Sequence, residues 1–529
     1  MRKTLISLGI AVAVCTAGWS LQPAAAQQGV RLPDMGSSAG SLITPAQEAQ
    51  YGAMYLREMR RFGLVLDDPL VDSWLQSMGF ALASATENSR GEYTFFMVRS
   101  RQVNAFATLG GYIGLNAGLV LAAESEDEVA AVMAHEIAHV TQRHIVRMVE
   151  QQQKDGPLIM LGMLAGLIAA SQANSADGAQ AAIAGGMGLM AQRQINHTRS
   201  AEQEADRLGI QTLARAGYDP TAMATFFGRM ARLTRAGGGD GQVPEFLRTH
   251  PVTTTRMSEA RDRAERIAAQ TQPQARPMAA AHPLLPPGLA GLDWQDADPG
   301  RGRMYAFARE RLRVLSATSP REAVAEYRRR ESGGQALDSA ERYGFALALT
   351  ANGAAGEAVA ILAELEAADP GNHWLRLAHA EALHRAGHRE RASAHFEDLV
   401  RDLPNNLAVV LSYAQALNEA ATAAAGRRSM ELLRGLGRAA EGDYSYQRIL
   451  ARAAELAGDD IRAAESHAEV AFLTGRAGDA LNQLRRLQSR DDLDYVQRAR
   501  VEARVAVITP VWLEMERQGI GPDGRPRGG

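Results

Sequence analysis

The segment His135-Glu136-Ile137-Ala138-His139 holds residue types that a metal-dependent hydrolase requires. Residues four apart on a helix lie on one face, so His135 and His139 can present two imidazoles to one ion. Glu136 lies about 100° around the helix from His135. Its carboxylate can take a proton from a water that attacks a peptide carbonyl and then protonate the leaving amine. The spacing predicts a zinc site with Glu136 as general base, against the alternative of a polar helix without metal.

A catalytic zinc site needs a third protein ligand and an open fourth position. The best candidates lie in the segment Glu202-Gln203-Glu204-Ala205-Asp206. Glu202 and Asp206 share a helix face, so one can bind the ion while the other accepts a hydrogen bond from a ligand imidazole. We expect Glu204 in solvent, and His144, five residues after His139, on a polar surface.

Local patterns indicate the elements that position these residues. A mainly helical stretch is expected over 45–86. Strands are expected at 93–98, 103–109 and 112–115, with a turn at Gly110-Gly111, in a small antiparallel sheet. Ser125 and Glu128 form a capping-box pattern that predicts a helix from Ser125 to about Met148, which would carry both histidines. A second helix is expected from about Thr198, carrying Glu202 and Asp206.

The composition is that of a globular chain with more than one domain. Its 529 residues are 46% hydrophobic and 22% charged, and the formal net charge of −3 gives no electrostatic case for nucleic acid. Residues 1–26 have a basic start, an apolar run and a small-residue end at Ala26, which predicts a signal peptide cleaved near Ala26. The alternative is a membrane-anchoring N-terminus. Cleavage would remove Cys15, the only cysteine, and we expect a periplasmic protein.

The rest of the chain divides by composition and repetition. We expect a flexible N-terminus at 27–44, a metallopeptidase domain at 45–270, a proline-rich linker at 271–300, a repeat domain at 301–515 and a disordered tail at 516–529. A 34-residue period is typical of the tetratricopeptide repeat. We expect a third copy that is lengthened by an insertion at 420–426. Seven residues of one copy have the same residue type 34 positions further along the chain. They are Ala346, Leu349, Gly353, Ala358, Leu365, Pro370 and Asn372.

Two apolar stretches within 157–190 are each short for a membrane span. We interpret them as a buried helical hairpin. The alternatives are a mobile flap or a surface that makes peripheral contact with a membrane or a partner.

The two motifs together with Asn104-Ala105-Phe106-Ala107 and the following Gly110-Gly111 resemble the zinc metallopeptidase family that includes the CAAX prenyl protease and the heat-shock protease HtpX. The signal peptide and repeats make the chain similar to a periplasmic branch of that family. The resemblance implies a mainly α fold with a small β-sheet, in which a zincin-like metallopeptidase domain precedes an α-solenoid of tetratricopeptide repeats.

The same resemblance implies roles for individual residues. His135, His139 and Glu202 would bind one Zn²⁺ per chain, and the catalytic residues would be Glu136 as general base and Asp206 as partner of a ligand. Asn104, Ala105, Phe106 and Ala107 would form the strand along which substrate adds. His250 lies in a segment resembling a loop whose histidine can take the fourth zinc position and hold the enzyme latent; a surface histidine is the alternative.

Three functions are compatible with these patterns. The first is a periplasmic zinc endopeptidase that hydrolyses unfolded or misassembled proteins, with the repeats docking clients. By resemblance, it would act in outer-membrane protein quality control and contact the β-barrel assembly machinery. The second is a chaperone or assembly scaffold with a latent or structural metal site. The third, an integral membrane protease, would need longer apolar spans.

Overall fold

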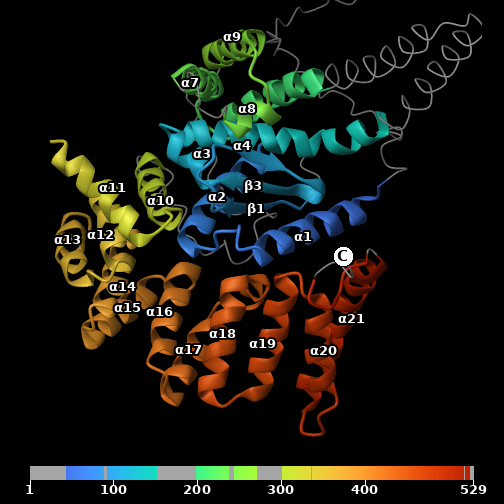
Figure 1. Cartoon of the computed structure of the whole chain (residues 1–529), viewed down its shortest axis with the longest axis vertical. Helices are drawn as coiled ribbons and strands as arrows, with labels where there is room; N and C mark the ends of the chain where they lie inside the picture. Colours follow the sequence, from blue (N-terminus) through green and yellow to red (C-terminus); the bar gives the residue numbers. More distant parts are fainter. Residues whose placement is uncertain are drawn as a thin grey trace, which may run out of the picture.

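The computed structural model describes residues 43–87, 92–151, 198–236, 244–270, 301–334, 336–517 and 519–524. In this part of the chain, a helical domain surrounds a small sheet, and a curved array of helices follows one side of it (Figure 1). The predicted fold class, mainly α with a small β-sheet, is confirmed. The predicted signal peptide 1–26, most of the 27–44 segment, the apolar stretches in 157–190 and the linker 271–300 lie outside the described residues.

Two helices open the first domain, as the sequence predicts. α1 (Pro45–Arg61) begins with a capping box in which the Thr44 side chain accepts from the Gln47 amide. α2 (Pro69–Ser84) begins at Asp68, whose carboxylate accepts from the Val71 amide. Both helices have proline at the first turn, where the missing N–H costs no hydrogen bond.

The sheet lies between α1 on one face and α2 with α4 (Glu126–Thr141) on the other. Its strands are β1 (Thr94–Val98), β2 (Ala105–Ala107) and β3 (Tyr112–Asn116). Side chains alternate along β1. Phe95 and Met97 join the core formed with α2 and α4, whereas Phe96 and Val98 pack with α1 residues on the opposite face.

The prediction of an antiparallel sheet is only partly right. The strand order is β1-β3-β2. β2 and β3 form the expected antiparallel pair, with Phe106 opposite Gly114, but β1 runs parallel to β3. Residues 99–104 carry the chain past the central position, so β3 later enters between β1 and β2. The predicted turn at Gly110-Gly111 is present, and Gly110 has a φ of 72°. A Cβ there would lie 2.5 Å from Ala49 Cα, so the turn requires glycine.

The two edges of the sheet differ. The outer edge of β1 is covered by 64–66, since the Leu66 amide donates to the Met97 carbonyl at 2.8 Å and Val65 pairs with Val98. β2 forms the opposite edge. Just before it, the Val103 carbonyl accepts from the Phe246 amide at 3.0 Å.

Further helices complete the first domain around α4. They are α3 (Ala117–Ala122), helical residues 144–151 and 198–215, α7 (Ala222–Ala236), α8 (Glu245–Thr249) and α9 (Thr254–Gln270). The segment 198–215 lies close against α4, because a Cβ at Gly209 would come within 3.2 Å of the His135 amide nitrogen. This close approach brings the two predicted ligand helices together.

The second domain is an array of antiparallel helix pairs. The first helices of three successive pairs begin 34 residues apart, at Ser339, His373 and Leu407, which agrees with the predicted period. The next such interval is 37 residues, from Leu407 to Tyr444. The extra length lies in the connection 436–443, between α17 and α18. The predicted insertion at 420–426 is wrong, because the connection 420–422 has the same length as the corresponding connection 386–388 in the preceding pair. The helices are α10 (Arg301–Leu315), α11 (Pro320–Ser332), α12 (Ser339–Ala351), α13 (Ala355–Ala368), α14 (His373–Arg385), α15 (Arg389–Asp402), α16 (Leu407–Glu419), α17 (Ala423–Gly435), α18 (Tyr444–Ala457), α19 (Asp460–Leu473), α20 (Ala477–Gln488) and α21 (Tyr495–Arg517).

The array is attached to the first domain at both ends. At the first end, Tyr305 of α10 donates to the Val120 and Ala123 carbonyls, and Arg311 forms a bidentate ion pair with Asp68 at 2.8 Å. At the other end, the Arg57 guanidinium lies 4.1 Å from the centre of the Phe472 ring. Between these contacts lies a cavity of about 570 Å³, lined by α1, α2 and β1 on one side and by α16 to α19 and their connections on the other. We call this whole contact the domain boundary.

The segment 519–524 also takes part in the domain boundary. Residues 519–524 lie beside α20 and α1, where the Asp479 amide donates to the Pro522 carbonyl at 3.2 Å and Arg61 donates to the Gly524 carbonyl. This differs from the expectation of a disordered tail from residue 516, because the segment finds backbone partners that the local sequence does not show. Among the described residues, no helix has both the length and the apolar character needed to cross a membrane.

Candidate metal centre

α4 positions the first two candidate ligands. Its N-cap Ser125 accepts from the Glu128 amide at 3.3 Å, and three acidic residues occupy the first turn. The capping box is only half formed, because the Glu128 carboxylate accepts from the Glu124 amide at 2.8 Å instead of the Ser125 amide. His135 and Glu136 are buried, and His139 lies one turn further along the same face as His135.

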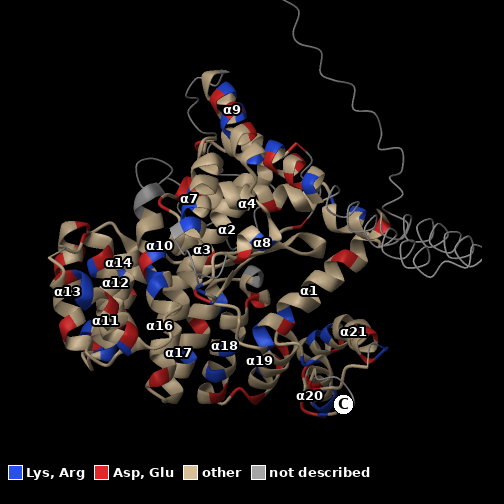
Figure 2. Ribbon diagram, turned by 45° about the horizontal axis from the view of Figure 1, so that its top comes forward, with Lys and Arg blue, Asp and Glu red and all other residues tan. Residues whose placement is uncertain are grey.

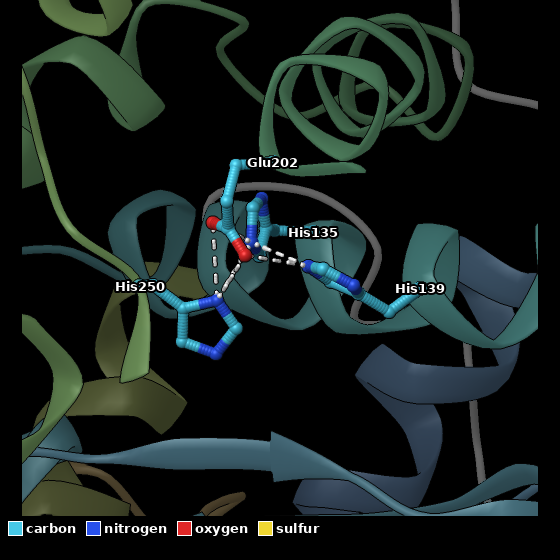
Figure 3. A group of neighbouring side chains, drawn as sticks. All are labelled: His135, His139, Glu202 and His250. Carbon is cyan, nitrogen blue, oxygen red and sulfur yellow. Dashed lines mark hydrogen bonds and ion pairs between the residues drawn. The ribbon is translucent and has the colours of Figure 1, made fainter. Parts of the chain in front are cut away.

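Four side chains meet on this face, and we call them the metal cluster: His135, His139, Glu202 and His250 (Figure 3). The Nε2 atoms of His135 and His139 lie 3.0 Å apart, and they are 3.4 and 3.5 Å from the Glu202 carboxylate. His250 Nδ1 lies 3.0 Å from Glu202 and 3.3 Å from His135 Nε2. The structure therefore brings the three predicted ligands and His250 into one buried group.

These distances fit a small ion. Ligand atoms around a tetrahedral zinc, with bonds of about 2.1 Å, stand roughly 3.4 Å from one another. The separations of 3.0 to 3.5 Å within the metal cluster match that arrangement without movement of the backbone. Three imidazoles and one carboxylate are also a donor set that suits zinc among divalent ions.

Asp206 and Arg256 lie behind the ligands. Asp206 Oδ1 is 2.9 Å from His135 Nδ1, the position from which a carboxylate fixes the tautomer of a ligand imidazole. Arg256 of α9 contacts both acids, with distances of 2.7 Å to Asp206 and 2.9 Å to Glu202. No sequence pattern pointed to Arg256. It lies 50 residues or more along the chain from both acids, and it belongs to no recognised motif. Its role therefore depends on the packing of α9.

The pKa shifts of these side chains reflect their close packing. Burial by itself lowers the pKa of His135, but Asp206 and Glu202 raise it by more, so that the pKa is raised to about 10. Burial and the neighbouring His135 lower the pKa of His139. Burial opposes ionisation of Glu202, yet hydrogen bonds with His135 and His250 hold its pKa below the usual range. The carboxylates are therefore charged, and they attract a cation to the cluster.

His144 and Glu204 differ from their expected positions. α4 ends at Thr141, and Arg143 adopts a left-handed φ of 52°, so His144 begins a new helical turn that folds back toward the cluster. The His144 and His139 Nδ1 atoms lie 2.9 Å apart, and His144 Nε2 is 3.2 Å from Glu204. His144 is buried and helps orient His139, whereas we expected a polar surface residue. No glycine or proline marks this break in the sequence.

Glu136 lies beside the metal cluster without joining it. Its side chain is 1% exposed, and its Oε1 has no hydrogen-bond partner among the described residues. The nearest cluster atom is His250 Nε2 at 3.4 Å. The His250 ring therefore stands between Glu202, which its Nδ1 contacts, and Glu136.

Comparison with known proteins agrees with this geometry. The model of peptidase family M48 matches residues 69–264, and a tetratricopeptide repeat model matches residues 349–417. The β-barrel assembly-enhancing protease of Escherichia coli K12 is 32% identical over 508 residues, which is 96% of each chain. The chain belongs to peptidase family M48. The Yersinia pestis protein of the same name is 31% identical over 508 residues, covering 96% of this chain and 97% of its own. A Vibrio cholerae relative whose name also refers to β-barrel assembly is 43% identical over 251 residues, 47% of this chain and 51% of its own.

Membership of family M48 makes the chain a metallopeptidase with a tetratricopeptide region, and it agrees with the resemblance seen in the sequence. The match covers the residues that hold the metal cluster, from α4 to α9. Acidic and basic residues are interspersed along the ribbon of both domains (Figure 2).

Proposed function

We propose that this M48 metallopeptidase is a zinc-dependent endopeptidase that hydrolyses peptide bonds of unfolded or misassembled proteins. The observation that carries the proposal is the buried Glu136 carboxylate, one oxygen of which has no hydrogen-bond partner among the described residues, beside four side chains at ligand distances. A structural metal site needs no such free carboxylate, because its ligands close the coordination sphere.

The residues divide into those that hold the ion and those that move protons. His135, His139 and Glu202 would hold zinc, and Asp206 would keep His135 in the tautomer that presents Nε2. When bound, zinc supplies Lewis acidity to a water and to a substrate carbonyl. Glu136 accepts the proton of the attacking water, and it then donates this proton to the leaving amine. Its burial keeps bulk water away from that transfer.

Substrate would add along β2. The opposite edge of the sheet is already covered by 64–66, so the edge of Asn104, Ala105, Phe106 and Ala107 is the one beside the metal cluster that can accept an extended peptide. Backbone hydrogen bonds along a strand bind many sequences, which suits unfolded clients. The α8 segment now contacts the start of this edge through the Phe246 amide and the Val103 carbonyl.

His250 would hold the enzyme latent. Its ring lies between Glu202 and Glu136, where the attacking water must stand. The segment is fixed by buried Phe246, whose ring centre is 5.1 Å from that of His250, and by Arg256, which donates to the Pro251 carbonyl. Movement of 244–251 would release both the fourth coordination position and the β2 edge.

The test is cleavage of an unfolded model protein by the wild type, Glu136→Gln and His250→Ala, with zinc content measured in each. We expect Glu136→Gln to lose about 100- to 10,000-fold in rate while keeping zinc, since only proton transfer is removed. His250→Ala should cleave faster than wild type. Arg248→Ala, an exposed change in the same segment, is the control and should match wild type.

Two outcomes would contradict these assignments. Zinc bound in all variants with cleavage by none would remove the endopeptidase proposal. Unchanged activity in His250→Ala would remove latency alone.

The cellular role is proposed from the relatives. The name that these relatives share, β-barrel assembly-enhancing protease, supports a role in outer-membrane protein quality control, with contacts to the β-barrel assembly machinery. The expected signal peptide 1–26 supports export to the periplasm. Fractionation of cells and N-terminal sequencing of the mature chain would test this location, and a cytoplasmic protein that starts at Met1 would contradict it.

A second candidate function is an assembly scaffold with a structural metal. The position of His250 favours it, because a fourth ligand closes a zinc site. The repeats would then act through surfaces that the first domain leaves free. The His250→Ala assay separates the two functions, since opening a purely structural site would lower zinc affinity without producing cleavage.

A further inference from the structure

A second group of potential ligands lies in the repeat array, far along the chain from the metal cluster. It consists of Glu366 on α13, His379 on α14 and His395 on α15, and we call it the repeat cluster. His379 Nδ1 lies 2.5 Å from one Glu366 oxygen, and His395 Nδ1 lies 3.9 Å from the other. The two imidazole ring centres are 4.8 Å apart. Three consecutive helices thus converge on one carboxylate.

His379 is unusual within this group because it is buried and only half satisfied. It is 4% exposed, and its Nε2 has no hydrogen-bond partner among the described residues. If Nδ1 carries the proton that Glu366 accepts, Nε2 holds a buried lone pair with nothing to bind. Burying such a group without a partner costs free energy, so a packing role alone gives no account of histidine here.

Other histidine–glutamate pairs in the array show what an ordinary structural pair looks like. His384 Nε2 lies 2.9 Å from Glu419, and His467 Nε2 lies 2.7 Å from Glu455. In both pairs an arginine also contacts the carboxylate, Arg385 in the first and Arg452 in the second.

Glu366 differs from Glu419 and Glu455 in the residues that contact its carboxylate. Among the described residues its contacts at ion-pair distance are the two histidines, and the nearby Arg376 pairs with Asp402 at 2.6 Å. The carboxylate therefore lacks a permanent positive charge of its own, while two imidazoles stand next to it. That combination is the one that a divalent cation satisfies.

We propose that Glu366, His379 and His395 bind a divalent transition-metal ion, with Zn²⁺ the best match to two imidazoles and a carboxylate. One donor atom from each residue already lies within 4.8 Å of the others. Binding through His379 Nδ1 would place the ring proton on Nε2, and the Nδ1 and Glu366 atoms, now 2.5 Å apart, must separate by about 1 Å to reach the roughly 3.4 Å spacing of ligands on one ion. Glu366 and His395 side chains are 20% and 32% exposed, which leaves room for that shift and for water as the remaining ligand.

The consequence would be mechanical. An ion held by α13, α14 and α15 would join two successive helix pairs at one point, so it would stiffen the array where repeats otherwise contact only their neighbours. The site lies within the residues that match the tetratricopeptide model. It is independent of the proposed peptidase function, because it shares no residue with the metal cluster.

The experiment counts zinc bound by the full mature chain. Wild type, His395→Ala and His384→Ala are dialysed against the same micromolar free Zn²⁺, and bound zinc is measured by mass spectrometry. His395 is the residue to change, because it is partly exposed and its loss should leave the fold intact, whereas His379 is buried. We expect wild type to hold one ion more than His395→Ala, and His384→Ala to match wild type in both zinc content and peptidase activity.

A second readout guards against loosely bound surface zinc. Added Zn²⁺ should raise the unfolding temperature of the repeat array in wild type and in His384→Ala, and this increment should be absent in His395→Ala. Equal zinc content in wild type and His395→Ala would overturn the proposal. An equal loss of zinc in His395→Ala and His384→Ala would also overturn it, because it would show adventitious binding by any histidine pair.

Discussion

The metal centre and the domain boundary both bury carboxylates, but they balance the charge differently. In the centre, Arg256 contacts both Glu202 and Asp206, and Glu136 is buried beside the same cluster, so these acids exceed the positive charge of Arg256. At the boundary, Asp68 is matched by Arg311 in a bidentate pair. The centre can receive a further cation, whereas the charge of Asp68 is already balanced by Arg311.

The boundary also contains a group that is not matched. Asp72 lines the cavity between the domains, and its pKa is raised well above the ordinary value by burial and by the nearby Asp67, Asp443 and Asp68, with Arg60 acting in the opposite direction. Without a close partner, an acid in such a place takes up a proton instead of binding an ion. The difference between the two regions is therefore the availability of converging imidazoles, which only the centre has.

The largest expected effect is that of Arg256→Met. Removing the guanidinium leaves Glu202 and Asp206 buried with less compensation, and we expect a loss of about 3 to 5 kcal/mol of unfolding free energy in the metal-free chain. The loss should be smaller with zinc bound, because the ion supplies positive charge to the same acids. Denaturant unfolding with and without chelator measures both values. Arg261→Met, an exposed change on the same helix, should alter neither, and equal losses with and without zinc would contradict the charge argument.

Arg311→Met should have a smaller effect that does not depend on zinc. Asp68 would lose its ion pair but would still accept from the Val71 amide, so we expect a loss of about 2 to 3 kcal/mol. The same unfolding experiments apply. A zinc-dependent loss at Arg311 would show that the boundary and the centre are coupled, and the contrast between them would fail.

Asp72→Asn should have the smallest effect, and it should be stabilising. Because the folded chain holds the Asp72 proton at pH values where the unfolded chain releases it, wild-type stability falls as pH rises from near the ordinary value toward the raised pKa. Asparagine removes that fall, so the gain should be on the order of 1 kcal/mol at pH 8 and absent at pH 4. Thermal unfolding at both pH values measures it, and a gain that is larger at pH 4 would reverse the assigned sign.

Local sequence was sufficient for features whose cause is local. The 34-residue period follows from the repeated helix pair, and its caps recur at Asn372 and Asn406. The helix carrying His135 and His139 begins at Ser125 because that side chain satisfies a first-turn amide. The spacing of Glu202 and Asp206 correctly placed both on one face toward α4, since the helical period alone decides which residues share a face.

Features that depend on distant segments were missed. The parallel pairing of β1 with β3 depends on the path of 99–104, and nothing in β1 itself distinguishes the two directions. His144 turned inward because the chain breaks at Arg143, where no residue type signals a left-handed conformation. Arg256 reaches the ligands only through the packing of α9.

By itself, then, the sequence determined the class of chemistry, the helices that carry it and the repeated form of the second domain, because helix period and capping act within a few residues. Tertiary structure alone decided that His250 enters the space between Glu202 and Glu136, that the array closes on α1 and α2, and that Glu366, His379 and His395 converge. Each of these joins residues distant in sequence or on separate helices. Such contacts depend on how whole helices and strands pack together, and the local spacing of residues does not determine that packing.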